Sequence, residues 1–394
     1  MTFTTKYYES IDIQLQFIKQ LTCIPEDTIA EIIEEFKSFI FQDDEKMKII
    51  YGIGEGRSAL SLYDFLQQLL KFEHIFPVTL DDPIRRYFDS GRKNMIIAAS
   101  GSGNTESVIS YLNDANKLGA KEILITANPE SKGYKTIQSH KGFIIMLEDT
   151  KLDKPSNLAV MGSEFELKLC TFLNCLLPAL ENNNIQSYYD EVNHFIKNAE
   201  LLKNIGKDPD KKSNEDPGKD HLRSWIEKLF NRRGHIIVDG VGRSGFVARA
   251  FGMRLTHLGM HVYIKGDATT PSFVRGDVYI PITGSGDTRE ILDGMKKARE
   301  KGVDIFPITV SKNSELVTYL KEIQHEDNII YIPVQEKDRE IFHDRTPSKI
   351  NTTKMNEIRS SYSEINSYIF TNAVIASAID ILGVNEKYMT RIHW

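Results

Sequence analysis

The sequence predicts an α/β protein of two tandem domains, each a mainly parallel five-stranded sheet flanked by helices in a three-layer, flavodoxin-like arrangement. Three observations predict this class. Continuous apolar runs alternate with amphipathic stretches, the pattern occurs twice, and 394 residues suit two hydrophobic cores. Hydrophobic residues make up 41% and charged residues 26% of the chain, which is the composition of a globular protein.

Two motifs are repeated in the same order. The first is an apolar strand that ends in a glycine turn followed by Arg-Ser: IIYGIGEGRSAL at 49–60 and IIVDGVGRSGF at 236–246. The second is a strand that runs into Gly-Ser-Gly-polar-Thr: IIAASGSGNTE at 96–106 and YIPITGSGDTRE at 279–290. Ser244 follows Ser58 by 186 positions, and Ser285 follows Ser102 by 183 positions. Two ordered matches at nearly the same offset indicate a duplicated domain.

The elements follow from periodicity and from the glycines that end them. In the first copy we expect strands at 49–54, 95–100, 122–127 and 142–147, with a helix at 105–120. In the second copy we expect strands at 235–240, 261–266, 276–283, 304–310 and 328–334, with helices at 246–259 and 288–302. Segments 10–45 and 186–230 are predicted to be helical. A charged stretch rich in proline and glycine then divides the chain into an N-terminal domain (1–200), a linker (201–220) and a C-terminal domain (221–394).

Charge and composition exclude several classes. The net charge of −6 argues against a general nucleic-acid binder, which needs a basic surface. Cys23, Cys170 and Cys175 are too few and too irregular for a disulfide framework or a thiolate metal site. The sequence has no signal-peptide pattern and no apolar run of the roughly 18 residues that a membrane span requires. We therefore expect a soluble cytoplasmic protein without a membrane or nucleic-acid partner.

The glycine turns are the predicted ligand site, because open parallel sheets bind ligands outside the carboxyl ends of their strands. A tight turn, hydroxyl groups and a helix N-terminus together suit a phosphate monoester. The residues expected to bind it are Gly56, Arg57, Ser58, Ser100, Ser102, Asn104, Thr105, Gly242, Arg243, Ser244, Thr283, Ser285, Asp287 and Thr288. In the alternative interpretation, the serines and threonines only cap helices and the glycines only make turns.

Nucleotide sites fit the sequence less well. The chain has no Gly-x4-Gly-Lys-Ser/Thr run, and Gly240, Gly242 and Gly245 match only the bare spacing of a dinucleotide turn. Arg57 and Arg243, beside the turns, could pair either with phosphate or with a carboxylate of the opposite copy.

These motifs resemble sugar isomerase (SIS) domains. The second copy is similar to 6-phospho-3-hexuloisomerases over nearly all of 220–394, through GVGRSGFVARAFGMRLTHLG, GDATTPSFVRGDVYIPITGSGDT and YSEINSYIFTNAVIASAIDILG. The first copy is a divergent SIS domain with GEGRSA, SGSGNTE and MGSEFE, and after Leu70 it lacks the Thr-Thr-Pro loop. The second copy is therefore the expected place for an intact phosphosugar loop.

The resemblance implies a catalytic glutamate at the start of a C-terminal helix. It falls on Glu166 in the first copy and Glu364 in the second, 198 positions apart, so we expect an insertion around 343–355. It also implies His393 as a candidate acid, whereas His257 is expected to be packed in a helix. One carboxylate can move a proton between adjacent sugar carbons through an enediolate, without a metal or nucleotide cofactor.

The sequence thus predicts an intramolecular oxidoreductase, an aldose–ketose or ketose isomerase that acts on sugar phosphates. The alternatives are an amino-sugar phosphate isomerase, deaminase or deglycase, and a phosphosugar sensor without catalysis. We expect the fused copies to pack as a pseudo-dimer and the chain to form a homodimer. A site could then combine the turns of one copy with the glutamate of the other.

Overall fold

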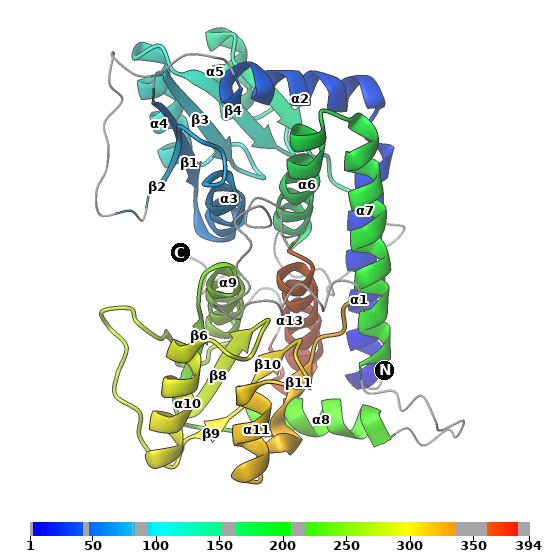
Figure 1. Cartoon of the computed structure of the whole chain (residues 1–394), viewed down its shortest axis with the longest axis vertical. Helices are drawn as coiled ribbons and strands as arrows, with labels where there is room; N and C mark the ends of the chain where they lie inside the picture. The colour runs from blue at the N-terminus through cyan, green and yellow to red at the C-terminus, as the bar shows by residue number, and fades with distance from the viewer. Residues whose placement is uncertain are drawn as a thin grey trace.

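The computed structural model describes residues 3–41, 47–80, 82, 93–150, 163–205, 217–335 and 361–384. Two α/β units lie at opposite ends of the molecule, and a layer of four helices lies between their sheets (Figure 1). The predicted α/β class with two parallel-sheet domains is confirmed.

The first sheet has the strand order β2-β1-β3-β4-β5, and all its pairs are parallel. This is the flavodoxin-like order, with two crossovers in opposite directions from β1. Its strands are β1 (Lys48–Gly54), β2 (Ile75–Thr79), β3 (Lys93–Ala99), β4 (Lys121–Thr126) and β5 (Phe143–Met146). Every residue of β1 is buried, as expected for a central strand covered on both faces.

The second sheet repeats this topology in the order β11-β10-β8-β6-β7, again with parallel pairs only. Its strands are β6 (Ile236–Gly240), β7 (Val262–Ile264), β8 (Val278–Thr283), β9 (Asp304–Ile305), β10 (Ile308–Thr309) and β11 (Ile330–Tyr331). β9 and β10 both pair with β8 in one continuous register, so they are two pieces of the predicted strand 304–310. Pro307 lies between them and has no N–H to donate to the ladder.

Helices cover both faces of each sheet. In the first unit they are α3 (Gly56–Leu69), α4 (Glu106–Lys117), α5 (Lys132–His140) and α6 (Ser163–Asn182). In the second they are α9 (Arg243–His257), α10 (Arg289–Glu300), α11 (Glu315–Glu322) and α13 (Tyr362–Ile381). The four central helices are α3, α6, α9 and α13, which pack on one another across the boundary between the copies.

Four further helices flank the units: α1 (Phe3–Gln20), α2 (Glu26–Ile40), α7 (Ile185–Glu200) and α8 (Pro217–Phe230). Short 3₁₀ helices lie at η1 (Leu21–Cys23), η2 (Leu201–Asn204) and η3 (Glu326–Asn328). Both ends of the predicted linker 201–220 are therefore helical. No helix within the described ranges is long and apolar enough to cross a lipid bilayer.

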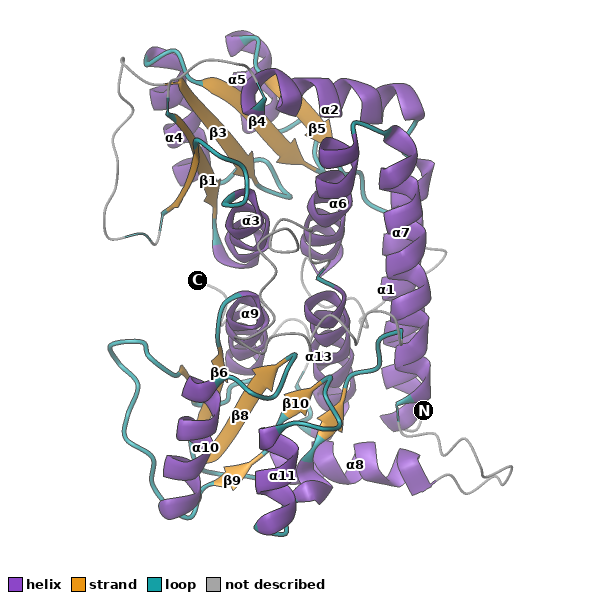
Figure 2. Ribbon diagram, viewed as in Figure 1, coloured by secondary structure: helices purple, strands orange, loops and turns teal. Residues whose placement is uncertain are grey.

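α1 lies beside α7 along one side of the molecule and packs against the second copy (Figure 2). The Gln14 amide donates to the Ile369 carbonyl at 3.1 Å and accepts from Asn372 at 3.1 Å, so it binds two turns of α13. The Tyr7 and Phe370 rings meet edge to face at 6.0 Å. α1 thus contributes side chains to the packing around α13 in the second copy.

Candidate functional site

The first glycine turn of each copy joins the end of the central strand to a central helix. A Cβ on Gly54 would lie 2.9 Å from the Ala59 amide nitrogen, and one on Gly240 would lie 2.6 Å from the Ser244 carbonyl oxygen. Only glycine allows the helix to approach the strand this closely. Gly56 and Gly242 then have positive φ angles of 54° and 60°.

The second turn of each copy begins with a buried hydroxyl at the carboxyl end of a strand. In the first copy the Ser100 hydroxyl accepts from the Gly103 amide at 3.1 Å and lies 2.8 Å from the Thr105 hydroxyl. In the second copy Thr283 accepts from the Gly286 amide at 3.2 Å. Ser102 and Ser285 accept from the amides two residues on, at 3.2 and 3.3 Å. The predicted turns are present, and their hydroxyl groups organise them as well as facing their edge of the sheet.

Asn104 and Asp287 have a structural role at equivalent positions. The Asn104 side-chain oxygen accepts from the Lys132 amide at 3.0 Å, and the Asp287 carboxylate accepts from the Glu315 amide at 2.8 Å. Each ties the second turn to the start of α5 or α11. These contacts hold the turns in place, and phosphosugar binding by Asn104 and Asp287 stays a prediction. Thr105 and Thr288, by contrast, precede α4 and α10 without a side-chain cap bond.

Glu166 and Arg57 form an ion pair in the first copy. The Arg57 Nη2 lies 3.2 Å from the Glu166 Oε1, and their side chains are 5% and 12% exposed. The ring of Phe165 packs on Gly101, where a Cβ would meet it at 2.9 Å, so the start of α6 lies against the Ser-rich turn. The structure thus brings together the predicted base and both predicted turns of the same copy.

Residues of the second copy complete this group, which we call the Glu166 cluster: Arg57, Ser163, Glu166, Arg254 and Tyr368. The Arg254 Nη2 on α9 donates to the Ser163 hydroxyl at 2.6 Å. Burial, and after it the charge of Arg57, lower the pKa of Arg254 to about 9, while the charge of Glu166 acts in the opposite direction. At neutral pH the guanidinium is therefore still charged. Burial also raises the pKa of the Tyr368 phenol, which lies within the fields of Arg57, Glu166 and Arg254.

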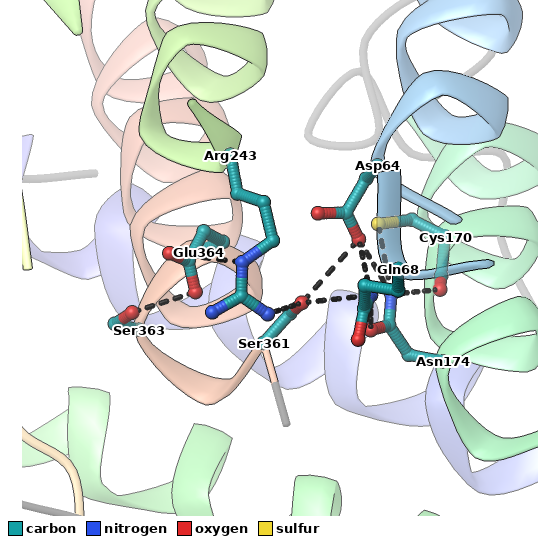
Figure 3. Close-up of polar contacts among 8 residues, drawn as sticks. All are labelled: Asp64, Gln68, Cys170, Asn174, Arg243, Ser361, Ser363 and Glu364. Atoms are coloured by element: carbon teal, nitrogen blue, oxygen red, sulfur yellow. Dashed lines mark hydrogen bonds and ion pairs between the residues drawn. The ribbon is translucent and has the colours of Figure 1, made fainter. Parts of the chain in front are cut away.

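Arg243 and Glu364 form the equivalent group in the second copy, drawn in Figure 3 with its neighbours. The Arg243 Nε lies 3.9 Å from the Glu364 Oε1, and its Nη1 donates to the Ser361 hydroxyl at 2.9 Å. The Ser363 hydroxyl donates to the Glu364 Oε2 at 2.7 Å. Each glutamate is thus paired with the arginine of its own copy. The combination of one copy's turns with the other's glutamate stays a prediction.

The first copy contributes a second carboxylate to this group, which we call the Glu364 cluster: Asp64, Gln68, Cys170, Asn174, Arg243, Ser361 and Glu364. The Asp64 Oδ2 accepts from Asn174 at 2.8 Å and from Ser361 at 3.4 Å (Figure 3). Burial raises the pKa of Asp64, and Arg243 offsets part of this increase. Burial by itself lowers the pKa of Arg243, but the charges of Glu364 and Asp64 outweigh it and raise the pKa. Arg243 therefore faces carboxylates from both copies.

The structure describes some of the remaining predicted residues and not others. Ser58 is buried in the first turn of α3, and Ser244 is half-buried at the start of α9. His257 is buried on α9, as expected. His393 and the expected insertion at 343–355 lie outside the described residues. Sequence reasoning missed Asp64, Arg254 and Tyr368, because each joins the cluster of the opposite copy. Arg254 and Tyr368 lie within the stretches that carry the resemblance, but their position there does not show that they are buried beside a glutamate of the other copy.

A cavity of about 360 Å³ opens beside the first turn of the first copy. It is lined by that turn (Gly54, Glu55 and Gly56), by one face of α9 and by Asp267 in the loop after β7. Space for a small molecule thus exists next to one glycine turn, at the contact between the copies.

The comparisons with known proteins agree with this fold. The SIS domain model matches residues 228–345. A protein of Methylomonas aminofaciens named 3-hexulose-6-phosphate isomerase is 32% identical over 168 residues, which cover 43% of this chain and 83% of that protein. One of the same name from Methanocaldococcus jannaschii is 42% identical over 93 residues, 24% of this chain and 51% of that protein.

Two solved structures extend the likeness over the whole chain at the level of the fold. Tagatose-6-phosphate ketose/aldose isomerase from Escherichia coli has a TM-score of 0.61 and 15% identity, covering 98% of this chain and 96% of that one. The C-terminal domain of glucosamine-fructose-6-phosphate aminotransferase from Francisella tularensis has a TM-score of 0.57 and 14% identity, covering 98% and 97%. With two sheets of one topology, repeated glycine turns and these relatives, the chain belongs to the SIS-domain family of phosphosugar isomerases.

Proposed function

We propose that the protein is a phosphosugar isomerase that moves a carbonyl group between adjacent carbons of a sugar phosphate through an enediolate, with a glutamate as the base. The observation that carries the proposal is the arginine-paired glutamate at the start of α6 and of α13, next to the turns at the carboxyl ends of the strands. Relatives named 3-hexulose-6-phosphate isomerase support the reaction class.

The chemistry needs one base that acts twice. The carboxylate takes a proton from the carbon next to the carbonyl, and the C–H electrons form the C=C bond of the enediolate. The same group, now protonated, returns the proton to the former carbonyl carbon. The former carbonyl oxygen takes up the proton that the neighbouring hydroxyl group gives up, and the carbonyl forms again one position along. Glu166 and Glu364 are the two candidates. Glu166 has the freer geometry, because its Oε2 has no hydrogen-bond partner among the described residues, whereas the Glu364 Oε2 accepts from Ser363.

The arginine beside each glutamate can stabilise the negative charge that develops on the enediolate oxygen. Such a charge is stabilised most by donors that are already oriented and shielded from water. Arg57 is 6% exposed and is held at the first turn of α3, so it would change little in position during the reaction.

The turns would hold the phosphate. Ser100, Ser102, Thr283 and Ser285 keep a hydroxyl group that can donate, and α4 and α10 begin directly after the turns. A helix N-terminus offers unpaired N–H groups and a favourable dipole to a phosphate. Phosphate binding would then place the reacting carbons against the base.

Glu166→Gln and Glu364→Gln test the proposal, with Glu227→Gln on the exposed face of α8 as the matched control. Wild type and variants are incubated in D₂O with hexulose 6-phosphates, pentulose 5-phosphates and glucosamine 6-phosphate, and ¹H and ¹³C NMR follow product formation and deuterium incorporation. We expect loss of the catalytic carboxylate to reduce turnover about 10³-fold, within the usual range for a general base. The isomerase proposal fails if wild type binds sugar phosphates but turns none over. Release of ammonia from glucosamine 6-phosphate would favour the amino-sugar alternative.

The proposal also covers the division of the chain into two SIS domains and its association into a dimer. We infer that residues 221–394 form one SIS copy and most of 1–200 the other, and that two chains associate as a homodimer. Light scattering coupled to size-exclusion chromatography measures the second point directly, since a particle of the 45.0 kDa chain mass would contradict it.

A further inference from the structure

The two clusters are built from equivalent positions. Arg243 follows Arg57 by 186 residues on the α3/α9 pair, and Glu364 follows Glu166 by 198 residues on the α6/α13 pair. Ser361 is related to Ser163 by the same 198 positions, and each serine is bonded from the opposite copy: Ser163 by Arg254 at 2.6 Å and Ser361 by Gln68 at 3.4 Å. An approximate twofold relation therefore superimposes one cluster on the other.

Three of the equivalent positions carry different chemistry. Arg254 of the Glu166 cluster corresponds to Gln68 of the Glu364 cluster. Asp64 of the Glu364 cluster corresponds to Ala250. The third pair is the phenol Tyr368 and the thiol Cys170. All three differences lie on helices that reach the cluster from the opposite copy: α9 and α13 at the Glu166 cluster, and α3 and α6 at the Glu364 cluster. None lies in a turn or at a glutamate.

These exchanges change the charge balance. Among the described residues, the Glu166 cluster has the cations Arg57 and Arg254 against one carboxylate, an excess of one positive charge. The Glu364 cluster has Glu364 and Asp64 against Arg243, an excess of one negative charge when Asp64 is ionised and no net charge when it is protonated. A sugar phosphate and its enediolate are anionic, so in either state of Asp64 the Glu166 cluster attracts them more strongly.

Buried polar atoms without a hydrogen-bond partner among the described residues occur in both clusters: the Glu166 Oε2 and the Tyr368 hydroxyl in the Glu166 cluster, and the Asp64 Oδ1 in the Glu364 cluster. Buried polar atoms are almost always bonded, so the open catalytic carboxylate oxygen and the open phenol fit groups that a ligand satisfies. In the Glu364 cluster the open atom is not on the glutamate, whose Oε2 accepts from Ser363.

We infer that the Glu166 cluster, in the divergent first copy, is the one that takes the sugar phosphate, and that Arg254 is a positioning residue lent to it by the second copy. The inference rests on the proposed function and reverses the expectation that the second copy carries the working site. Arg254 is 1% exposed, so it acts through the charge it adds and through Ser163.

The pseudosymmetry supplies the matched substitution. Arg254→Gln gives the first cluster the residue that stands at the equivalent position of the second, and Arg254→Lys keeps the charge. Gln68→Ala changes the equivalent position in the other cluster, and Arg223→Gln removes an exposed arginine of α8 that pairs with Glu227. Circular dichroism and thermal melting check that each variant is folded.

Isothermal titration with fructose 6-phosphate and with inorganic phosphate measures the outcome. We expect Arg254→Gln to weaken binding about tenfold, which corresponds to about 1.4 kcal/mol, and Arg254→Lys to stay within about threefold of wild type. Gln68→Ala and Arg223→Gln should change binding less than twofold. In any turnover assay, Arg254→Gln should raise KM more than it lowers kcat.

Three results would overturn the inference. Arg254→Gln could bind the probes as tightly as wild type, Gln68→Ala could lose more affinity than Arg254→Gln, or wild type could bind neither probe. Failure of the isomerase proposal gives a different result. A sensor without catalysis would turn over no sugar phosphate, but its affinity for fructose 6-phosphate would still fall on Arg254→Gln.

Discussion

Asp64→Asn should stabilise the protein at neutral and alkaline pH, although it removes a buried charged group beside an arginine. Asp64 is 4% exposed, its Oδ1 has no partner among the described residues, and its Oδ2 has one good hydrogen bond, from Asn174 at 2.8 Å. Arg243 is shared with Glu364. An asparagine can keep the Asn174 bond through its amide oxygen and needs no counter-charge.

The pH dependence gives the sign. Burial raises the pKa of Asp64 in the folded chain above its value of about 4 in the unfolded chain, so the folded chain binds this proton more tightly. The carboxyl therefore contributes stability at pH values below about 4, and that contribution is lost as the pH rises through the higher folded pKa. Asparagine does not titrate, so the advantage of the variant should grow over that window and then stay constant.

We expect a gain of about 1–2 kcal/mol in the free energy of unfolding at pH 8, the cost of one poorly compensated buried charge, and little difference at pH 4. Urea denaturation of wild type and variant at pH 4, 6 and 8 measures it, with the exposed Asp190→Asn as the control. The reasoning is refuted if Asp64→Asn is less stable than wild type at pH 8, or if the difference between them does not change with pH.

Three further substitutions test the packing that holds the clusters. Gly240→Ala places a Cβ 2.6 Å from the Ser244 carbonyl oxygen, and we expect a loss of about 2–3 kcal/mol in urea denaturation. Gln14→Ala removes both bonds between α1 and α13 and should cost about 1–3 kcal/mol; an unchanged midpoint would show that α1 does not hold the second copy. Trp225→Phe keeps the ring but loses the 2.8 Å bond to the Asn328 carbonyl, so thermal melting should show a loss of about 1 kcal/mol.

Much of the fold could be predicted because it follows local rules. Apolar runs gave the central strands, and the glycine turns marked their carboxyl ends, since only glycine fits where Gly54 and Gly240 meet the next helix. β2 was not predicted: it reads IFPVT, with a proline and an exposed Phe76, which suits an edge strand but lacks the pattern of a buried one.

The candidate site was predictable only where its residues belong to local motifs. Glu166, Glu364 and the turns sit in motifs that can be recognised along the chain. Asp64 and Arg254 sit in the middle of amphipathic helices, where a charged residue ordinarily faces water. Their burial depends on how the two copies pack, and packing between distant segments leaves no periodic signal in a single sequence.

Fusion of the copies explains how the clusters could become different. In a dimer of identical chains, one gene position supplies both equivalent sites, so the residue at the position of Arg254 and that at the position of Gln68 would have to be the same. Here each position can change alone. The helices of the opposite copy carry all three differences, and two of them, Arg254 against Gln68 and Asp64 against Ala250, change the charge. The turns and paired glutamates, which each copy keeps for itself, are equivalent in both. Divergence at the contact between copies therefore offers a way to make one of two similar sites cationic without altering the groups that we propose to bind phosphate and to move the proton.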